Sequence, residues 1–429
     1  MTQEHRIVVV GGGVAGLDIA SHLGGKQFGD RRFSVTLVDR EPAHVWKPML
    51  HTIAAGTQEV TTQQTSYLVQ AHNRGFAYEP GEVTSVDREG RSVRVAALRL
   101  GGDDVLPERS VVYDTLVLAV GSEANDFGTP GVDEHCRTIN SRGEAIAFND
   151  LLRTRMLKAF AAGKAFSVAI VGGGATGVEL AAEIVQLVDL VEHYGIADAG
   201  EKLRVTLIES GDRLLGSFPE RVSREVRKSL EQMGVHVRTG ARVARADECG
   251  FSLPDGGYVE ADLKVWAAGV RAPTLIRSIE GIERTPAGQV VVGRDLVCVN
   301  DRSIVAVGDC ASIRGDPLGK TVPTTAQAAS QQAAYVIDHL ATILDRKQVS
   351  NFDYRDFGSL VSLGGYDAYG TLGRFGLFKG GFLRGRVAQI GHAMLYRRHQ
   401  VRLHGLRRGS LLWISDMIGS RVRPRARLS

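Results

Sequence analysis

Two glycine-rich segments of the chain have the residue spacing of dinucleotide-binding loops. The motif G-x-G-x-x-G occurs at residues 11–16 after the apolar run RIVVV, and again at residues 172–177 after the run SVAIV. In such a loop the first glycine makes a tight turn, the second lets the backbone approach a pyrophosphate, and the third lets the following helix pack closely on the strand. Because a helix N-terminus offers free N–H groups to phosphates, we expect one dinucleotide at each loop. The motif glycines are Gly11, Gly13, Gly16, Gly172, Gly174 and Gly177.

An acidic residue ends the next apolar run after each loop. Asp39 ends the run SVTLVD, and Glu209 ends the run RVTLIE. A carboxylate at this point can accept hydrogen bonds from ribose hydroxyls and would repel a 2′-phosphate. Two dinucleotide folds in one chain indicate one tightly held cofactor and one exchangeable one. We therefore expect FAD at the first loop and NADH at the second, with hydride passing from nicotinamide to flavin.

The elements that must position these loops follow from the same segments. Each segment has a β-branched run, a glycine turn, an Ala/Leu-rich helix start and a second apolar run, which is the order of a βαβ unit. Two such units predict two similar domains. Further strands are expected at residues 115–120, 264–268 and 303–307. One long helix is expected at residues 324–344, after Pro323 and with Thr324 or Thr325 as its N-cap.

The composition is that of a globular protein with an excess of glycine. Of the 429 residues, 43% are hydrophobic and 23% are charged, and 51 glycines stand against 12 prolines. Glycine excess without proline favours close backbone approach over flexible linkers. We expect no signal peptide and no membrane-spanning helix. The four cysteines are widely spaced and the twelve histidines form no ligand pattern, so no metal site is expected, and Cys310 is predicted to be a buried structural thiol.

The net charge of +4 is unevenly distributed along the chain. Residues 384–429 hold eleven Arg and a single acid, so this tail is +10 and the rest of the chain is −6. A short helix is expected at residues 411–418, with Ser410 as N-cap and Gly419 just after its end. An apolar face flanked by Arg clusters is typical of a helix lying on an anionic lipid surface. A dimer contact is an alternative that can coexist with lipid, whereas no motif supports nucleic-acid binding.

Two further expectations concern the region around this tail. Residues 352–382 are rich in glycine and aromatic residues, which indicates short strands or loops. The histidines of the tail are expected at the surface; they are His392, His399 and His404.

Five motifs together resemble the two-dinucleotide-binding-domain flavoproteins. They are GGGVAGL at 11–17, AVGSEANDFGTPG at 119–131, GGGATGVELAAE at 172–183, WAAGVRAP at 266–273 and AVGDCA at 306–311. Within that group, VDREPAHVWKPMLH at 38–51, AQAASQQA at 326–333 and the basic tail are similar to the bacterial type II NADH dehydrogenases. These are NADH:quinone oxidoreductases that do not pump protons. The resemblance covers essentially the whole chain.

The resemblance implies an α/β fold with two Rossmann-like domains of the glutathione-reductase type and a C-terminal membrane-anchoring region. It implies an FAD domain formed by residues 1–159 and 283–345, an NADH domain at 160–282 and the anchoring region at 346–429. A ubiquinone or menaquinone would be the acceptor. The protein would lie on the cytoplasmic face of the bacterial inner membrane, as a homodimer.

The resemblance also implies roles for single residues. Glu179 would lie near the flavin within the first turn of its helix and serve quinone reduction; the helix N-terminus would favour its charged form and apolar surroundings would oppose it. Gln327 and Gln331, which share a helix face, would line the quinone pocket. Asp309 would bind the flavin ribityl chain, and Lys47 would lie near the isoalloxazine or pyrophosphate. The other cofactor-binding positions would be Arg40, Val83, Ala119, Gly121, Thr176, Gly269 and Ala326.

The sequence also allows structural roles for these residues and other functions for the chain. Glu179 can be a helix-dipole glutamate, the two glutamines can be exposed, and Lys47 can be a solvated loop lysine. A sulfide:quinone oxidoreductase or disulfide reductase would need cysteines close to the flavin. A flavoprotein whose nucleotide-induced shape change controls a partner is a third reading, which slow turnover would favour.

Overall fold

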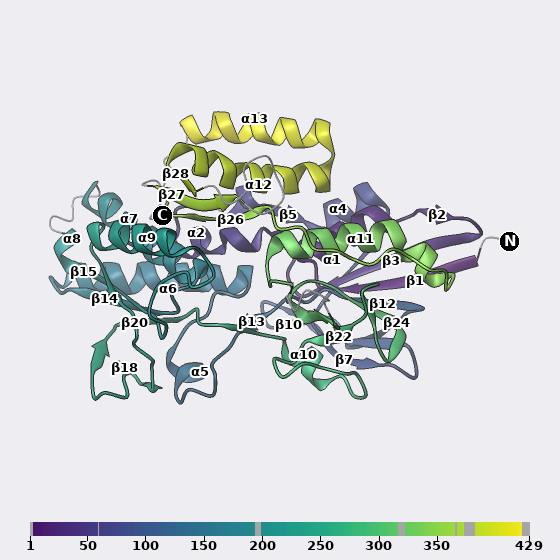
Figure 1. The fold of residues 1–429 in the computed structure, drawn as a ribbon, viewed down its shortest axis with the longest axis horizontal. Helices are drawn as coiled ribbons and strands as arrows, with labels where there is room; N and C mark the ends of the chain where they lie inside the picture. Colours follow the sequence, from purple (N-terminus) through teal and green to yellow (C-terminus); the bar gives the residue numbers. More distant parts are fainter. Residues whose placement is uncertain are drawn as a thin grey trace. The chain divides into compact units, whose positions relative to one another are not determined.

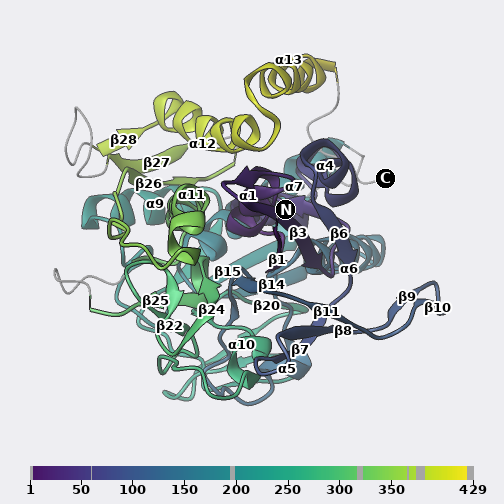
Figure 2. The same ribbon diagram turned by 90° about the vertical axis from the view of Figure 1, so that its right-hand side faces the viewer.

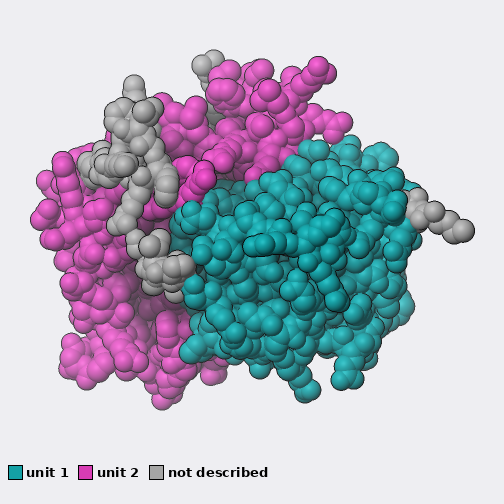
Figure 3. Space-filling model, turned by 45° about the vertical axis from the view of Figure 1, so that its right-hand side comes forward, with its two compact units in different colours: residues 1–47, 64–123, 270–354 teal, residues 48–63, 124–269, 355–429 magenta. Residues whose placement is uncertain are grey.

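The computed structural model describes residues 3–58, 60–193, 199–315, 322–364, 367–372 and 382–422. The chain forms two compact units, coloured separately in Figure 3. Unit 1 comprises residues 1–47, 64–123 and 270–354, and unit 2 comprises residues 48–63, 124–269 and 355–429. Each unit contains one of the two glycine-rich loops. The predicted four-part division into FAD, NADH and tail segments stays a prediction.

Unit 1 is built on a sheet of nine described strands, whose centre is parallel. Strand β1 (Gln3–Val10) pairs with β3 (Arg31–Asp39) on one side and β12 (Thr115–Leu118) on the other, and β12 pairs with β24 (Asp301–Ala306). Residues 7–10 of β1 are almost fully buried, as expected of a central strand with both faces covered. Helix α1 (Val14–Leu23) packs against α11 (Ala326–Leu344), and the two helices lie side by side in Figure 1. The strands predicted at 115–120 and 303–307 and the helix predicted at 324–344 are thereby confirmed to within two residues.

Unit 2 contains the second βαβ unit on a four-stranded parallel sheet. Its strands run in the order β16 (Val235–Arg238), β15 (Leu203–Ile208), β14 (Phe166–Val171) and β20 (Leu263–Trp266). Helices α7 (Ala175–His193) and α9 (Glu220–Gln232) contact this sheet. An apolar cluster that includes Val171, Phe251 and Trp266 joins the sheet to an antiparallel meander of β17 (Arg245–Ala246), β18 (Gly250–Ser252) and β19 (Tyr258–Glu260).

The C-terminal part of unit 2 is a small sheet covered by two helices. The strands β26 (Gly358–Ser362), β27 (Ala368–Leu372) and β28 (Phe382–Arg384) are antiparallel, which confirms the short strands expected there. Helix α12 (Arg386–His404) packs on this sheet, and α13 (Leu406–Val422) packs on α12; Figures 1 and 2 both show the two helices side by side. Among the described residues no helix is long and apolar enough to cross a membrane.

Two local predictions about this region were wrong. The tail helix is not a short segment at 411–418: it begins at Leu406 and continues through Ser410 and Gly419. His399 is not a surface residue, because only 6% of it is exposed. The side chain of His392 lies outside the described residues, and His404 is half-buried.

Candidate functional site

The glycine loop of unit 1 has no room for a side chain at the first and third glycines of its motif. Gly11 has φ +98°, and a Cβ on it would lie 2.5 Å from the carbonyl oxygen of Ala119. A Cβ on Gly16 would lie 1.8 Å from the carbonyl oxygen of Gly11. At Gly13, by contrast, a Cβ would meet only one atom, at 4.0 Å. The protein itself therefore leaves the backbone of Gly13 open, which fits the close approach of a pyrophosphate.

Side chains of unit 1 contact both backbone polar groups of Gly12, its N–H and its carbonyl oxygen. Its N–H donates to Asp39 Oδ2 at 2.5 Å, and its carbonyl oxygen accepts from the Tyr67 hydroxyl at 2.8 Å and lies 2.9 Å from His44 Nδ1. The other oxygen of Asp39 accepts from the Glu41 amide at 2.8 Å. Burial raises the pKa of Asp39 above its ordinary value, and these two amide donors oppose that shift. Both carboxylate oxygens keep a lone pair, so Asp39 can also accept from ribose hydroxyls.

Three side chains of unit 1 form a polar chain beside the ends of β12 and β24. Lys47 Nζ donates to the Ser122 carbonyl at 2.9 Å, and the Ser122 hydroxyl donates to Asp309 Oδ2 at 2.7 Å. The adjacent Gly308 amide donates to Gln332 Oε1 at 2.5 Å. Parallel strands place their carboxyl ends along one edge, where ligands of such sheets bind. The structure thus connects Lys47 and Asp309 through Ser122, and their contacts with FAD stay predictions.

Helix α11 starts next to this edge with a conventional cap. Thr325 is the N-cap, and its hydroxyl accepts from the Ala328 amide at 3.2 Å. Gln327 and Gln331 are half-buried on one face, and the Tyr354 hydroxyl donates to Gln327 Oε1 at 3.4 Å. The two glutamines are therefore neither fully exposed nor capping residues. Their assignment to quinone stays a prediction.

The glycine loop of unit 2 repeats the construction of the first. Gly172 has φ +117° with its Cβ position 2.6 Å from the Ala267 carbonyl oxygen, and a Cβ on Gly177 would lie 2.0 Å from the Gly172 carbonyl oxygen. A Cβ on Gly174 would meet nothing within 4 Å. The carboxylate of Glu209 accepts from the Gly173 amide and from the Gly211 amide, each at 2.6 Å. The two loops share the same crowded and open glycine positions and the same acid at the end of the second strand, which supports one dinucleotide in each unit.

Glu179 lies on α7 after this loop, in a buried polar pair. Its Oε2 is 3.3 Å from His51 Nδ1, and its Oε1 accepts from the Ser362 amide at 3.0 Å. The predicted position within the first turn was wrong by about one residue, since Glu179 is the fifth residue of α7 and the first turn holds no acid. Burial raises the pKa of Glu179 from 4.5 to about 8, although the hydrogen bond from the Ser362 amide acts in the opposite direction.

The remaining predicted cofactor positions differ in how far they are buried. Val83 and Ala119 are buried, while Arg40 pairs at the surface with Glu82 at 3.4 Å. Thr176 is exposed beside Gly174. Gly121 and Gly269 have φ +68° and +62°, and Ala326 is the first residue of α11. Their contacts with a cofactor stay predictions.

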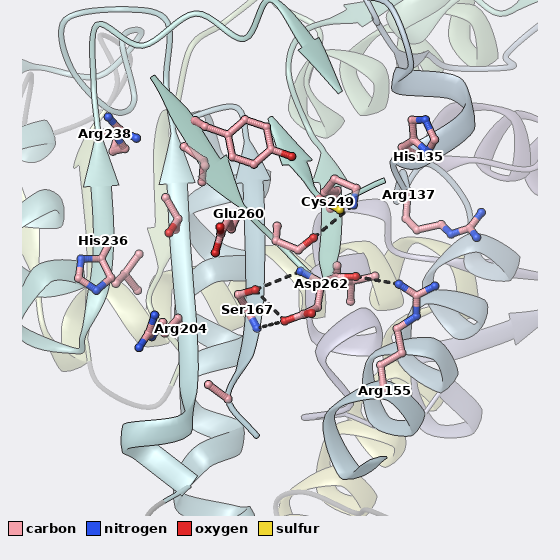
Figure 4. Close-up of a pocket in the computed structure, with 18 of the residues that line it drawn as sticks. His135, Arg137, Arg155, Ser167, Arg204, His236, Arg238, Cys249, Glu260 and Asp262 are labelled. Atoms are coloured by element: carbon pink, nitrogen blue, oxygen red, sulfur yellow. Dashed lines mark hydrogen bonds between the residues drawn. The ribbon is translucent and has the colours of Figure 1, made fainter. Parts of the chain in front are cut away.

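One cavity of unit 2 lies away from its nucleotide loop. It measures about 1540 Å³ and is lined by β14, β15, β16 and β20, with Arg204, His236 and Arg238 on its walls (Figure 4). Asp262 accepts there from Ser167 and, through its carbonyl, from Arg155. The glycine loop and Glu209 do not line it, so this cavity is not the dinucleotide site.

The cysteines support no dithiol site among the described residues. All four are free; Cys249 is exposed, whereas Cys136, Cys298 and Cys310 are buried. The prediction of a buried Cys310 is confirmed, and burial raises its thiol pKa to about 12. No cluster of potential metal ligands occurs in the described part of the chain.

Sequence reasoning missed four polar residues of these sites. They are His44, His51, Tyr67 and Gln332. Of these four, only Gln332 could have been predicted to be buried from the sequence pattern. It follows Gln331 directly and falls on the buried helix face of Ala328, Ala329 and Val336.

Comparison with known proteins agrees with this construction. Residues 5–333 match the Pyridine nucleotide-disulphide oxidoreductase family. The chain is 37% identical, over 98% of its length and 99% of the relative's, to a type II NADH:quinone oxidoreductase of Haemophilus influenzae. It is 28% identical, over 87% of its length and 91% of the relative's, to one of Staphylococcus saprophyticus.

Solved structures share the fold. NDH2 from Plasmodium falciparum in complex with NADH has a TM-score of 0.83 at 19% identity, covering 99% of this chain and all of that one. The sulfide:quinone oxidoreductase of Aquifex aeolicus has a TM-score of 0.72 at 18% identity, covering 94% and 92%. The matches span the whole chain and both glycine loops, so this chain belongs to the pyridine nucleotide-disulphide oxidoreductase family and, within it, to the type II NADH:quinone oxidoreductases.

Proposed function

We propose that this chain oxidises NADH and reduces a membrane quinone, using FAD and without pumping protons. The observation that carries the proposal is the pair of loops built alike in a chain 37% identical to a type II NADH:quinone oxidoreductase. Bound FAD would take up hydride and release two electrons to the quinone. In unit 1 the open backbone of Gly13, the acceptor oxygens of Asp39 and the Lys47–Ser122–Asp309 chain suit FAD.

The protein's own residues have distinct tasks in this reaction. Glu209 and the open Gly174 backbone orient NADH in unit 2, and an acid at position 209 disfavours a 2′-phosphate. We assign quinone reduction to Glu179, Gln327 and Gln331. An amide can donate to a quinone carbonyl without introducing charge into an apolar pocket.

Purified protein loaded with FAD tests the activity directly. We expect oxidation of NADH coupled to reduction of short-chain ubiquinone or menaquinone analogues, and much weaker turnover with NADPH. The matched control is Gly13→Asp, which fills the open backbone with a negative side chain and should lose FAD. Absence of quinone reduction with both quinone classes by FAD-loaded protein would overturn the assignment.

We also propose that α12 and α13 hold unit 2 on a lipid surface. The side of α13 that contacts α12 holds Gly409, where a Cβ would lie 2.9 Å from Val401, and Asp416, which pairs with Arg397. The exposed positions of α13 are apolar instead: Leu411, Trp413, Ile414, Met417 and Ile418 are 46–66% exposed. A surface helix with its apolar side chains turned outward suits lipid, and the exposed Arg407 and Arg408 suit anionic headgroups.

Sedimentation with vesicles tests whether the exposed apolar side chains of α13 bind lipid or mediate self-association. The double variant Trp413→Gln/Ile414→Gln should lose binding to anionic vesicles while keeping its activity with soluble quinone analogues. A dimer that persists in both proteins would show that the homodimer we expect uses another face. Unchanged sedimentation of the variant would place the attachment elsewhere. A location on the cytoplasmic face of the inner membrane completes the proposal, because NADH is produced in that compartment.

A further inference from the structure

A second acid and a histidine, neither of them assigned above, surround Glu179 inside unit 2. His51 belongs to α2 (Leu50–Ala55), which packs against α7, and its side chain is 4% exposed. Glu183 lies one turn after Glu179 on the same face of α7 and is 5% exposed. The Thr57 hydroxyl, just after α2, hydrogen-bonds to Glu183. Four polar side chains, from α7, α2 and the turn after α2, are thus collected in one site, in which Glu179, Glu183 and His51 are buried and Thr57 is partly exposed.

This cluster cannot hold two negative charges at low cost. Burial opposes ionisation of both acids, and each carboxylate would repel the other across one helical turn. The groups that act on the Glu179 carboxyl are His51 from α2, the Ser362 amide from β26 and Glu183 on α7 itself. The Ser362 amide is neutral, so His51 is the one group of these three that can balance a charge on Glu179. The cluster therefore stores at least one proton near neutral pH.

Quinone reduction requires such a proton. NADH supplies one hydride, which carries two electrons and one proton, whereas a quinone takes two electrons and two protons to become a quinol. The second proton comes from water. A buried donor that exchanges its proton with water provides it without exposing the reacting groups.

We propose that His51, acting as a positioning residue through Glu179, and Glu183 with Thr57 form the proton store that supplies this second proton. The inference rests on the proposed quinone reduction. The proton leaves Glu179 Oε2 for a quinone oxygen, the proton on His51 Nδ1 replaces it, and a proton from water restores His51. Glu183 holds a reserve proton and keeps the cluster neutral. No electron passes through these groups.

The test compares two acceptors in the full-length FAD-loaded protein. Quinone needs the extra proton, whereas ferricyanide takes only electrons. The variant His51→Asn places an amide where Nδ1 stands but cannot titrate. Its matched control is His5→Gln in unit 1, since His5 is also partly buried and hydrogen-bonded through a ring nitrogen, to Thr115 at 2.8 Å.

We expect His51→Asn to slow quinone reduction by about 10–100-fold while ferricyanide reduction changes less than about twofold. The loss should grow with pH, because fewer protons then reach the cluster. His5→Gln should match wild type with both acceptors. If His51→Asn fails to retain FAD, Glu183→Gln carries the same test, because its amide oxygen still accepts from Thr57.

Three outcomes would overturn the proton store or the proposed function. Equal quinone rates and equal pH profiles in wild type, His51→Asn and Glu183→Gln would refute the proton store and leave the proposed function intact. Wild-type protein that reduces ferricyanide but no quinone would refute the proposed function itself. A parallel loss with both acceptors in both variants would make the cluster structural and refute the proton store.

Discussion

Replacing Glu179 by Gln should make the protein's stability less dependent on pH. The folded protein keeps the Glu179 carboxyl protonated up to about pH 8, whereas the unfolded chain releases that proton near pH 4.5. Between these values the unfolded state binds fewer protons, so folding stability falls as pH rises. Gln is always neutral, and its oxygen can still accept from the Ser362 amide. The substitution should therefore be nearly neutral at low pH and stabilising at high pH.

The magnitude follows from the shift of the pKa. One pKa unit corresponds to about 1.36 kcal/mol, so moving from pH 5 to pH 8 should destabilise wild type by about 3–4 kcal/mol relative to Glu179→Gln. This is an upper value, because a protonated His51 at 3.3 Å would partly stabilise the carboxylate. For a domain of 150–250 residues it corresponds to a relative shift in Tm of roughly 7–14 °C.

Thermal unfolding of both proteins between pH 5 and pH 8 measures the effect. Saturating FAD is kept in every sample, because a ligand that binds only the folded state raises Tm by itself. The two Tm curves should separate progressively as pH rises, with Glu179→Gln above wild type. Curves that remain parallel over this range would show that Glu179 does not titrate there, and the account of its burial would be wrong.

Three further substitutions test single contacts. Tyr67→Phe removes the hydroxyl donor to the Gly12 carbonyl, so the Kd of the apoprotein for FAD should rise by about tenfold, measured by fluorescence titration. Glu209→Ala removes the acceptor of the Gly173 amide and the expected ribose contact; steady-state kinetics should show KM for NADH rising by about tenfold with kcat little changed. Thr325→Ala removes the N-cap of α11 and should lower the free energy of unfolding by about 1 kcal/mol in denaturant titrations.

The parts of the fold that repeat in sequence were the parts that sequence reasoning predicted well. Both glycine loops have short-range signatures, because the tight turn and the close helix–strand contact demand glycine at fixed spacing. Both bounds of α13 were predicted wrongly because they rested on local signals alone. Ser410 indicated a start and Gly419 an end, but the helix packs on α12 and runs through both residues. His51 had no local signal at all, since its partner lies far away in the chain and only the fold brings α2 to α7.

The differences between the two loops explain why one dinucleotide is expected to stay and the other to exchange. The Gly12 carbonyl is fixed by buried side chains, Tyr67 and His44, which come from elements outside the βαβ unit. Within the described part of the chain, the corresponding Gly173 carbonyl accepts a backbone hydrogen bond from the Leu215 amide at 2.8 Å. The glycine loop of unit 1 therefore has side-chain anchors from other elements, and preorganisation of a binding loop lowers the entropy lost on binding. In the glycine loop of unit 2, residues 174–176 are exposed. The same motif can thus hold a resident cofactor in unit 1 and a substrate in unit 2.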